Sequence, residues 1–192
     1  GPKIFSVSGH VNNPGNFEIP LGTSFKDLLE MAGGVRNGHK LKAVIPGGSS
    51  MKVLPAEQML ECTMDYDCLQ KAGSGLGSGA VIVMDETTCM VRACHRIARF
   101  YYAESCGQCT PCREGTGWMY RVLSRIVEGN GVADDLHRLK AVAGQIEGHT
   151  ICAFGEAAAW PVQGFLHHFW DEFEYFVAHG RSMTDSRAEA VA

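Results

Sequence analysis

Three cysteines within seven residues constrain this chain more than any other feature of its sequence. Cys106, Cys109 and Cys112 are separated by two-residue gaps, which let successive thiolates curl around one inorganic centre. Such a centre needs a fourth ligand, and Cys152 is the natural choice because it lies in another loop between expected helices. The sequence therefore predicts a fold in which two loops that are far apart in the sequence lie close together in space, at the same end of their domain.

An iron–sulfur cluster fits this spacing better than zinc does. Three clustered thiolates plus one remote thiolate are typical of a [4Fe–4S] cluster, whereas a four-cysteine zinc site usually shows two separated CxxC pairs. Zinc and no metal remain the alternatives. Gly107, Gly115 and Gly155 suit a backbone that approaches a bulky centre. Arg113 is the nearest cation, either raising the potential of the cluster or serving as an ordinary surface arginine.

The other four cysteines match no ligand spacing, and we interpret them as small buried hydrophobes or exposed free thiols. They are Cys62, Cys68, Cys89 and Cys94. Eight cysteines in 192 residues are also too sparse for a disulfide-stapled domain. A reducing compartment is therefore expected.

Several function classes are disfavoured by what the sequence lacks. With 17 Lys and Arg against 21 Asp and Glu, the chain carries a net charge of −4, so we expect no nucleic-acid binding. No window approaches the roughly 18 to 20 apolar residues of a membrane helix, and no signal peptide is visible, so we expect a soluble chain. The glycines of residues 73–79 precede a strand, and no phosphate-binding loop or catalytic triad is recognisable.

The first half of the chain predicts a small mixed sheet crossed by one helix. Phe5 and Val7 begin an alternating strand, a turn follows at residues 13–15, and further strands are expected at 41–45, 51–54 and 80–84. The helix is expected to begin after the N-cap Ser24 and to end at Gly33 and Gly34. This arrangement is a ubiquitin-like β-grasp domain over residues 3–84.

The second half predicts an all-α four-helix bundle over residues 85–179, followed by a disordered tail over 180–192. Two helices flank the cysteine loop, at about 87–104 and from there to Gly129. The third runs from about Asp134 to Gly148, and the fourth opens with Pro161 near its first turn. We interpret the aromatic residues between 160 and 177 as the core of the bundle, with an exposed docking face as the alternative. The fold class is therefore α+β, with the cluster carried by the bundle.

Six segments together resemble the NADH-binding flavoprotein subunits of respiratory complex I, the NADH:quinone oxidoreductases. They are residues 4–11 (IFSVSGHV), 43–50 (AVIPGGSS), 80–85 (AVIVMD), 105–118 (SCGQCTPCREGTGW), 146–152 (IEGHTIC) and 157–163 (AAAWPVQ). The resemblance covers roughly residues 3–178. It departs at residues 154–156, where Phe-Gly-Glu stands in place of Leu-Gly-Asp.

The resemblance implies a β-grasp domain of the soluble-ligand-binding kind followed by the iron–sulfur domain of the family. In that family hydride passes from NADH to FMN, and single electrons leave through a [4Fe–4S] cluster, here implied to be held by Cys106, Cys109, Cys112 and Cys152. FMN and NAD bind to an N-terminal domain that lies outside this chain, so no catalytic residue is assigned, and the chain alone is expected to be inactive as an enzyme.

The resemblance also implies partners and a location. The partners are a thioredoxin-like [2Fe–2S] subunit and a large multi-cluster iron–sulfur subunit, with no nucleic acid and no direct membrane insertion. The location is the cytoplasmic peripheral arm of a bacterial inner-membrane complex, or the mitochondrial matrix. Two alternatives stay open: the same domain in the diaphorase subunit of an NAD-linked hydrogenase or formate dehydrogenase, and a non-redox assembly or docking module.

Overall fold

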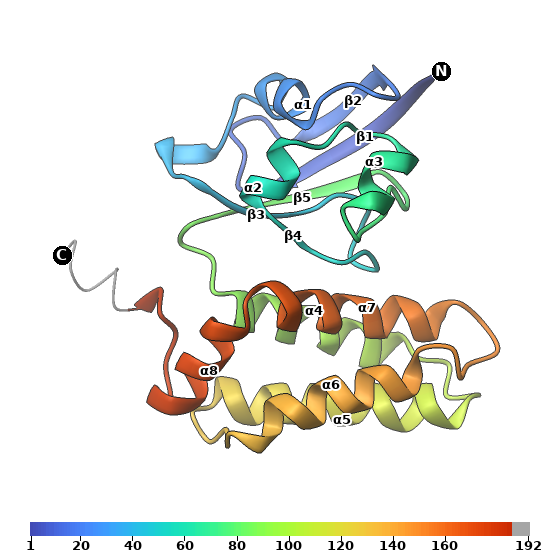
Figure 1. Ribbon diagram of the computed structural model, residues 1–192, viewed down its shortest axis with the longest axis vertical. Coiled ribbons are helices and arrows are strands. Elements are labelled where there is room, and N and C mark those ends of the chain that lie inside the picture. Colours follow the sequence, from blue (N-terminus) through green and yellow to red (C-terminus); the bar gives the residue numbers. More distant parts are fainter. Residues whose placement is uncertain (186–192) are drawn as a thin grey trace. The chain divides into compact units, whose positions relative to one another are not determined.

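The computed structural model describes residues 1–185, which form two compact units (Figure 1). Unit 1 is Gly1–Thr88, and unit 2 begins at Cys89. The sequence places the boundary between residues 84 and 85, slightly too early. The reason is that Thr87 and Thr88 still belong to unit 1: Thr87 Oγ1 donates to Asp85, and Thr88 Oγ1 lies 3.3 Å from His10 Nδ1.

Unit 1 contains a five-stranded mixed sheet with the strand order β2-β1-β5-β3-β4. The strands are β1 (Pro2–Gly9), β2 (Gly15–Pro20), β3 (Leu41–Ile45), β4 (Leu54–Pro55) and β5 (Ala80–Asp85). β1 runs parallel to β5 in the centre of the sheet and antiparallel to β2 at the edge. Phe5 and Val7 are buried while Ile4 is exposed, which confirms the alternation expected for β1.

Helix α1 (Phe25–Met31) covers the core of unit 1 as predicted. The Ser24 side chain caps it by accepting a hydrogen bond from the Asp27 backbone N–H at 3.1 Å. The chain then turns through Gly33 and Gly34, both at positive φ, before the short 3₁₀ helix η1 (Arg36–Gly38). Phe25 and Leu28 are fully buried in the core.

Two short helices, α2 (Ala56–Leu60) and α3 (Tyr66–Lys71), lie in a region where the sequence pattern predicts no helix. Each is too short to repeat an apolar position, so hydrophobic periodicity cannot reveal them. Asp65 is the N-cap of α3 and accepts a hydrogen bond from the Cys68 N–H at 2.8 Å. The side chains of Met59 on α2 and Leu69 on α3 are fully buried in the core.

A buried carboxylate joins three segments of unit 1. Asp85, at the end of β5, is fully buried, and its oxygens lie 2.8 Å from His10 Nδ1, 3.1 Å from His39 Nδ1 and 3.5 Å from Arg36 Nε. Burial alone would raise the pKa of Asp85, but hydrogen bonds from Thr87, His39 and His10 outweigh it and hold that pKa well below its usual range. The carboxylate is therefore charged and stabilises the crossing of β1, η1 and β5.

Unit 2 contains five helices within its described part. They are α4 (Met90–Glu104), α5 (Thr110–Val127), α6 (Asp134–Ile146), α7 (Phe154–His168) and α8 (Trp170–His179). The first three helices agree with the sequence prediction. The prediction of a single fourth helix that begins near Pro161 is wrong. Pro161 lies inside α7, which begins seven residues earlier, and the break falls at Phe169 instead, where φ is −131°.

Proline at a helix start is the commoner case, because an interior proline removes one N–H···O bond. Here Pro161 is buried, as are Ala158, Ala159 and Val162 on the same helix, so packing compensates the lost bond. Phe165, Phe173 and Phe176 are also fully buried, which confirms that these three aromatic residues belong to the bundle core. Trp160 and Trp170 are half-buried.

Part of the segment expected to be a disordered tail has specific contacts. Asp185 accepts hydrogen bonds from both terminal nitrogens of Arg92 on α4, at 2.7 and 2.9 Å, and Ser182 is buried. Residues 186–192, the remainder of that prediction, lie outside the described residues. The bundle therefore includes the chain at least as far as Asp185.

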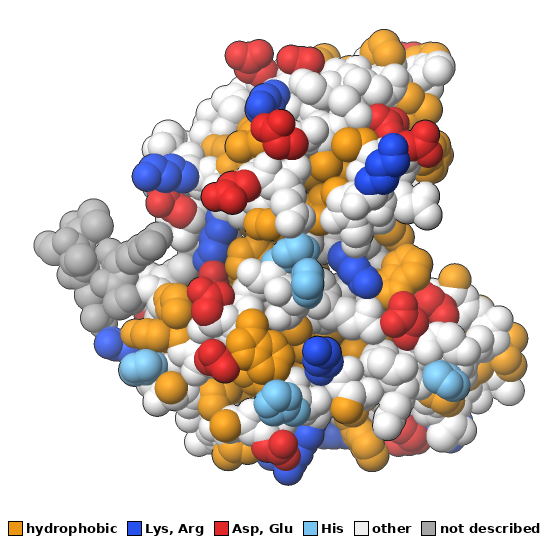
Figure 2. Space-filling model, in the orientation of Figure 1, with side chains coloured by type: hydrophobic (Ala, Val, Ile, Leu, Met, Phe, Trp, Pro, Cys, Tyr) orange, Lys and Arg blue, Asp and Glu red, His pale blue; other side chains and the backbone are white. Residues whose placement is uncertain are grey.

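The surface carries no concentration of one charge on the face that Figure 2 shows: Lys and Arg side chains alternate with Asp and Glu over both units. No described helix is long and apolar enough to cross a lipid bilayer. The α+β class predicted from the sequence is confirmed by the mixed sheet and the helical unit.

Candidate iron–sulfur centre

The four cysteines lie in two loops of unit 2, beside the ends of three helices. Cys106 follows α4, Cys109 is the N-cap of α5, and Cys112 lies in the first turn of that helix. Cys152 comes just before α7. Figure 1 shows the α4–α5 loop and the α6–α7 loop at the same end of the bundle. The meeting of two distant loops expected from the cysteine spacing is therefore present.

A hydrogen bond joins the two loops directly. The backbone N–H of Ile151 donates to Cys109 Sγ at 3.4 Å. Burial raises the pKa of the Cys112 thiol, and charges on Cys106, Cys152 and Cys109 raise it further. The charges of the other three predicted cysteines are therefore close enough to act on the Cys112 thiol.

The site is buried on one side and open on the other. Cys112 is only 7% exposed, and its Sγ lies 3.2 Å from Ser105 Oγ. Cys106 and Cys152, in contrast, are exposed. Ile151, in the α6–α7 loop next to Cys152, is 86% exposed. Its position leaves one rim of the site facing solvent.

The surroundings favour an anionic group with soft ligands. Helices α5 and α7 both begin at the site, so the positive ends of their dipoles lie beside the thiolates. Thiolate sulfur is the ligand that iron–sulfur clusters and zinc share. Within residues 1–185, no three or more His, Cys, Asp or Glu side chains are arranged to hold a single metal ion.

Arg113 holds the first cysteine loop in shape. Its guanidinium donates to the Gly107 carbonyl at 2.9 Å, to Thr110 Oγ1 at 3.4 Å and to Glu114 Oε1 at 3.0 Å. Gly107 itself has a φ of +77°, a conformation that favours glycine. Arg113 is thus more than an ordinary surface arginine, because it fixes the backbone on which two of the cysteines sit.

The second loop is fixed by acids that no sequence motif indicates. Glu147 accepts hydrogen bonds from Trp160 Nε1 at 2.6 Å and from Gln163 Nε2 at 2.8 Å, and Glu156 accepts one from the Gly148 N–H at 3.0 Å. Glu156 is the longer acid noted at residues 154–156. The only available signal was the position of these acids around Cys152, which spacing rules do not assess.

Two glycines near the cysteines have a different purpose from the one expected. A Cβ at Gly115 would lie 2.6 Å from Ile146 Cδ1, and a Cβ at Gly155 would lie 2.2 Å from Thr150 Oγ1. These contacts are shorter than side chains tolerate. Gly115 therefore lets α5 approach α6, and Gly155 lets the Cys152 loop fold against α7.

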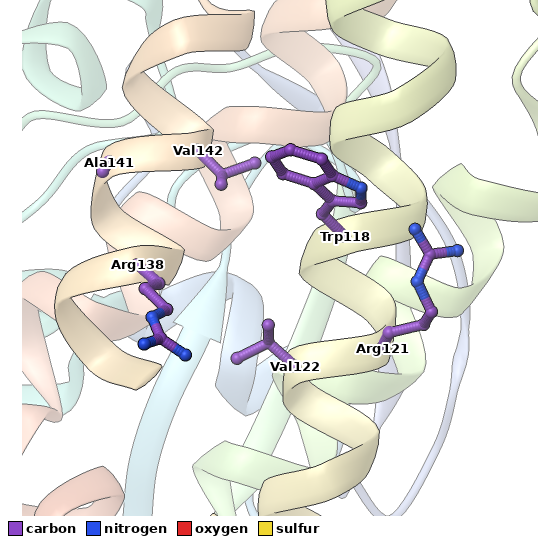
Figure 3. Close-up of a pocket in the computed structure, with 6 residues that line it drawn as sticks. All are labelled: Trp118, Arg121, Val122, Arg138, Ala141 and Val142. Atoms are coloured by element: carbon purple, nitrogen blue, oxygen red, sulfur yellow. The ribbon is translucent and has the colours of Figure 1, made fainter. Parts of the chain in front are cut away.

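Unit 2 has a second concave feature that lacks cysteine. A groove of about 290 Å³ lies between α5 and α6 (Figure 3). Trp118 points from α5 toward Val142 of α6, and Arg121 and Arg138 lie at the edges. Arg138 is paired with Asp134 at 2.7 Å. No sequence pattern predicts this groove, which is separate from the four thiols.

The four remaining cysteines of the chain do not join the site. Cys94 is fully buried on α4, and Cys89 is the N-cap of that helix, where its sulfur accepts a hydrogen bond from the Arg92 N–H at 3.5 Å. Cys62 and Cys68 belong to unit 1.

Two family models match the chain. The SLBB domain matches residues 4–54, in unit 1, and the iron-sulfur binding region of NADH-ubiquinone oxidoreductase-F matches residues 92–176, in unit 2. The second match contains all four cysteines of the candidate site.

Relatives found by sequence include F subunits of NADH-quinone oxidoreductase. The protein of that name from Rickettsia felis is 56% identical over 176 residues, and the one from Rickettsia bellii is 53% identical over the same length. The aligned region is 91% of this chain but only 42% of each relative, so the chain spans less than half the length of these proteins.

A solved structure shares the fold. The crystal structure of an NAD⁺-reducing [NiFe]-hydrogenase in its H₂-reduced state superposes with a TM-score of 0.82 at 32% sequence identity. The match covers 92% of this chain and 30% of the hydrogenase chain. Together, the two family regions and the sequence identity show that this chain corresponds to the C-terminal part of NADH-quinone oxidoreductase F subunits, the SLBB domain followed by the iron–sulfur binding region.

Proposed function

We propose that Cys106, Cys109, Cys112 and Cys152 ligate one [4Fe–4S] cluster and that this chain transfers electrons through it. The observation that carries the proposal is the meeting of the two cysteine loops, joined by the bond from Ile151 N–H to Cys109 Sγ. The family match to an iron–sulfur binding region supports it. When bound, the cluster would supply reversible one-electron chemistry.

The residues of the chain would tune and protect this chemistry. The N–H of Ile151 withdraws electron density from the Cys109 sulfur, and the starts of α5 and α7 stabilise added negative charge. Cys112 holds the buried side of the site, which limits the access of water there. Cys106 and Cys152 are on the exposed rim, where an electron donor or acceptor can approach.

We place this activity in an NADH:quinone oxidoreductase. In that assignment the chain receives electrons that originate from NADH and pass through FMN bound elsewhere in the same protein. It delivers them to a thioredoxin-like [2Fe–2S] subunit or a large multi-cluster subunit, in the cytoplasmic peripheral arm of a bacterial membrane complex. The chain alone would not oxidise NADH. The names of its relatives and their 53–56% identity support this assignment.

A second assembly is favoured by one specific observation, the match to an NAD⁺-reducing hydrogenase at 32% identity. In that case the same centre would serve the diaphorase subunit of a hydrogenase or formate dehydrogenase. Identification of the copurifying subunits separates the two. A hydrogenase or formate dehydrogenase large subunit without quinone-module subunits would displace the first assignment.

The cluster itself is tested by anaerobic reconstitution of the chain. We expect about four iron atoms and four acid-labile sulfides per chain and an electron paramagnetic resonance signal of a reduced cube. Cys152→Ser should abolish or strongly alter that signal, whereas the matched Cys94→Ser should retain it. An unchanged signal in Cys152→Ser would refute the ligand assignment, and stoichiometric zinc without iron would refute the cluster.

The remaining alternative is a non-redox docking module, and the same variants test it. A chain in which all four cysteines are replaced by serine contains no iron. If that chain still binds the partner subunits with unchanged affinity and supports their assembly and activity, the docking role is favoured. Loss of electron transfer with retained assembly supports the cluster proposal.

A further inference from the structure

Two cysteines of unit 1 are in contact, although they lie outside the candidate cluster site. Cys62 follows α2 and Cys68 lies on α3, and their thiols are within hydrogen-bonding reach of each other. Cys62 Sγ donates to the Gln58 carbonyl at 3.3 Å, and the Thr63 N–H donates to Cys68 Sγ at 3.4 Å. The pair is therefore held in place by the backbone on both sides.

The two thiols differ in environment. Burial, followed by its interaction with Cys68, raises the pKa of Cys62 to about 11. In contrast, the hydrogen bond from the Thr63 N–H lowers the pKa of Cys68 and outweighs partial burial and the charge of Asp65. Cys68 is consequently the better nucleophile, and Cys62 is a protonated neighbour that can respond to a change at Cys68.

Both thiols line a shallow pocket of about 610 Å³ on the surface of unit 1. Its wall has charges of both signs: Glu57 and Glu61 come from the α2 side, and Lys71 comes from α3. Glu61 also pairs with Lys26 at 3.5 Å, so Glu57 is the carboxylate offered to an ammonium group, and Lys71 offers an ammonium group to a carboxylate. The charge pattern of this wall fits a zwitterionic, amino-acid-like molecule.

We propose that Cys62 and Cys68 form a redox-active thiol pair that reacts with zwitterionic low-molecular-weight disulfides of the oxidised glutathione class. In the first step the Cys68 thiolate attacks one sulfur of the small disulfide, forming a mixed disulfide and releasing one small thiolate. In the second step Cys62 gives up its proton to that thiolate, and its sulfur attacks Cys68. A Cys62–Cys68 disulfide forms, and the second small thiolate leaves.

The electrons balance across these two steps. The protein loses two electrons and two protons, and one small disulfide becomes two small thiols. Since Cys62 holds its proton tightly, the second step is the slower one near neutral pH, and the mixed disulfide accumulates first. No other cysteine and no metal takes part, so the proposal is independent of the cluster.

The test uses the full chain and oxidised glutathione, with peptide mapping after rapid alkylation of free thiols. Trypsin is expected to release residues 53–71 as one peptide, which contains Cys62 and Cys68 and no other cysteine. We expect glutathione on Cys68 first, and then a peptide lighter by two hydrogens. Cys62→Ser should stop at the mixed disulfide, and Cys68→Ser should slow modification of the peptide roughly tenfold or more.

Controls distinguish the pair from general thiol reactivity. Cys94, which is fully buried, should remain unmodified in the same samples. The proposal is overturned if Cys62 and Cys68 stay free, if Cys62 is modified first, or if Cys62→Ser still yields the lighter peptide. Circular dichroism of both serine variants identifies any loss of fold, and for an unfolded variant the corresponding alanine variant replaces it.

The pocket is tested with a second disulfide. Glu57→Gln should slow the reaction with oxidised glutathione several-fold and leave the reaction with the uncharged disulfide of 2-mercaptoethanol unchanged. Equal rates for both disulfides in wild type and variant would overturn the assignment of a zwitterionic substrate.

Discussion

Trp160 Nε1 donates a hydrogen bond of 2.6 Å to Glu147, whose other oxygen accepts from Gln163. The bond joins the end of α6 to the middle of α7 across the loop that carries Cys152. Glu147→Ala would leave an indole N–H and an amide without this acceptor. We expect a loss of about 1–3 kcal/mol in the free energy of unfolding and faster iron loss to a chelator.

This expectation is measured by denaturant titration followed by tryptophan fluorescence, and by the rate of iron release from the reconstituted chain. Glu174→Ala removes an exposed acid of α8 and serves as the matched control. Equal iron loss in the two variants would show that the Glu147 contact does not support the Cys152 loop.

Arg113→Ala should weaken the first cysteine loop in a comparable way. The guanidinium binds the Gly107 carbonyl and Thr110, so its removal frees the backbone between Cys106 and Cys109. We expect roughly tenfold faster loss of the cluster, the lower end of the effects seen when residues behind metal ligands are removed. Arg96→Ala, which removes an exposed arginine of α4, should behave like the wild type.

Gly115→Ala tests the close approach of α5 and α6. The added methyl group would meet Ile146 Cδ1 at 2.6 Å, so we expect a destabilisation of about 1–3 kcal/mol. Replacing Ile146 by Val in the same chain removes Cδ1 and should restore part of the loss. Gly144→Ala is the control: it faces open space on α6 and should be neutral or stabilising by up to about 1 kcal/mol. Thermal unfolding of the wild type and the three variants decides the outcome.

Asp85 should make the stability of unit 1 depend on pH, with a loss of stability as the pH falls. Its pKa in the folded state is lower than the ordinary value of 3.8, so its contribution is complete above that pH and is lost as the pH falls below it. Asp85→Asn should lower stability at neutral pH and reduce the further loss on acidification. This pH dependence is measured by amide hydrogen exchange of the β5 peptide between pH 5 and 3, after correction for the intrinsic exchange rate at each pH. Asp67→Asn, an exposed acid of α3, should keep the wild-type profile.

Long elements and local caps were predictable because their signals repeat or are local. The apolar stripe of α5 and the N-cap at Ser24, whose side chain accepts from the Asp27 N–H, can be predicted from residues that are close in the sequence. Both are confirmed. Helices α2 and α3 are too short to repeat a pattern, and the interior position of Pro161 depends on tertiary packing, which overrides its local preference.

The same division applies to the candidate site. The spacing of Cys106, Cys109 and Cys112 indicates an inorganic centre, and the helix pattern brings Cys152 to the same end. The supporting contacts of Glu147 were not predictable, since they join residues 13 and 16 positions apart through side-chain geometry alone. Contacts of that kind follow from the packed structure and have no periodic signature.

The exposure of Ile151 has a consequence for any protein that docks at this end of the bundle. Covering that side chain would remove water from the rim formed with Cys106 and Cys152. Solvent exposure is one of the quantities that set the reduction potential of an iron–sulfur centre. Association and driving force would therefore be coupled: a bound neighbour would not only receive the electron but also help to fix the voltage at which it is released.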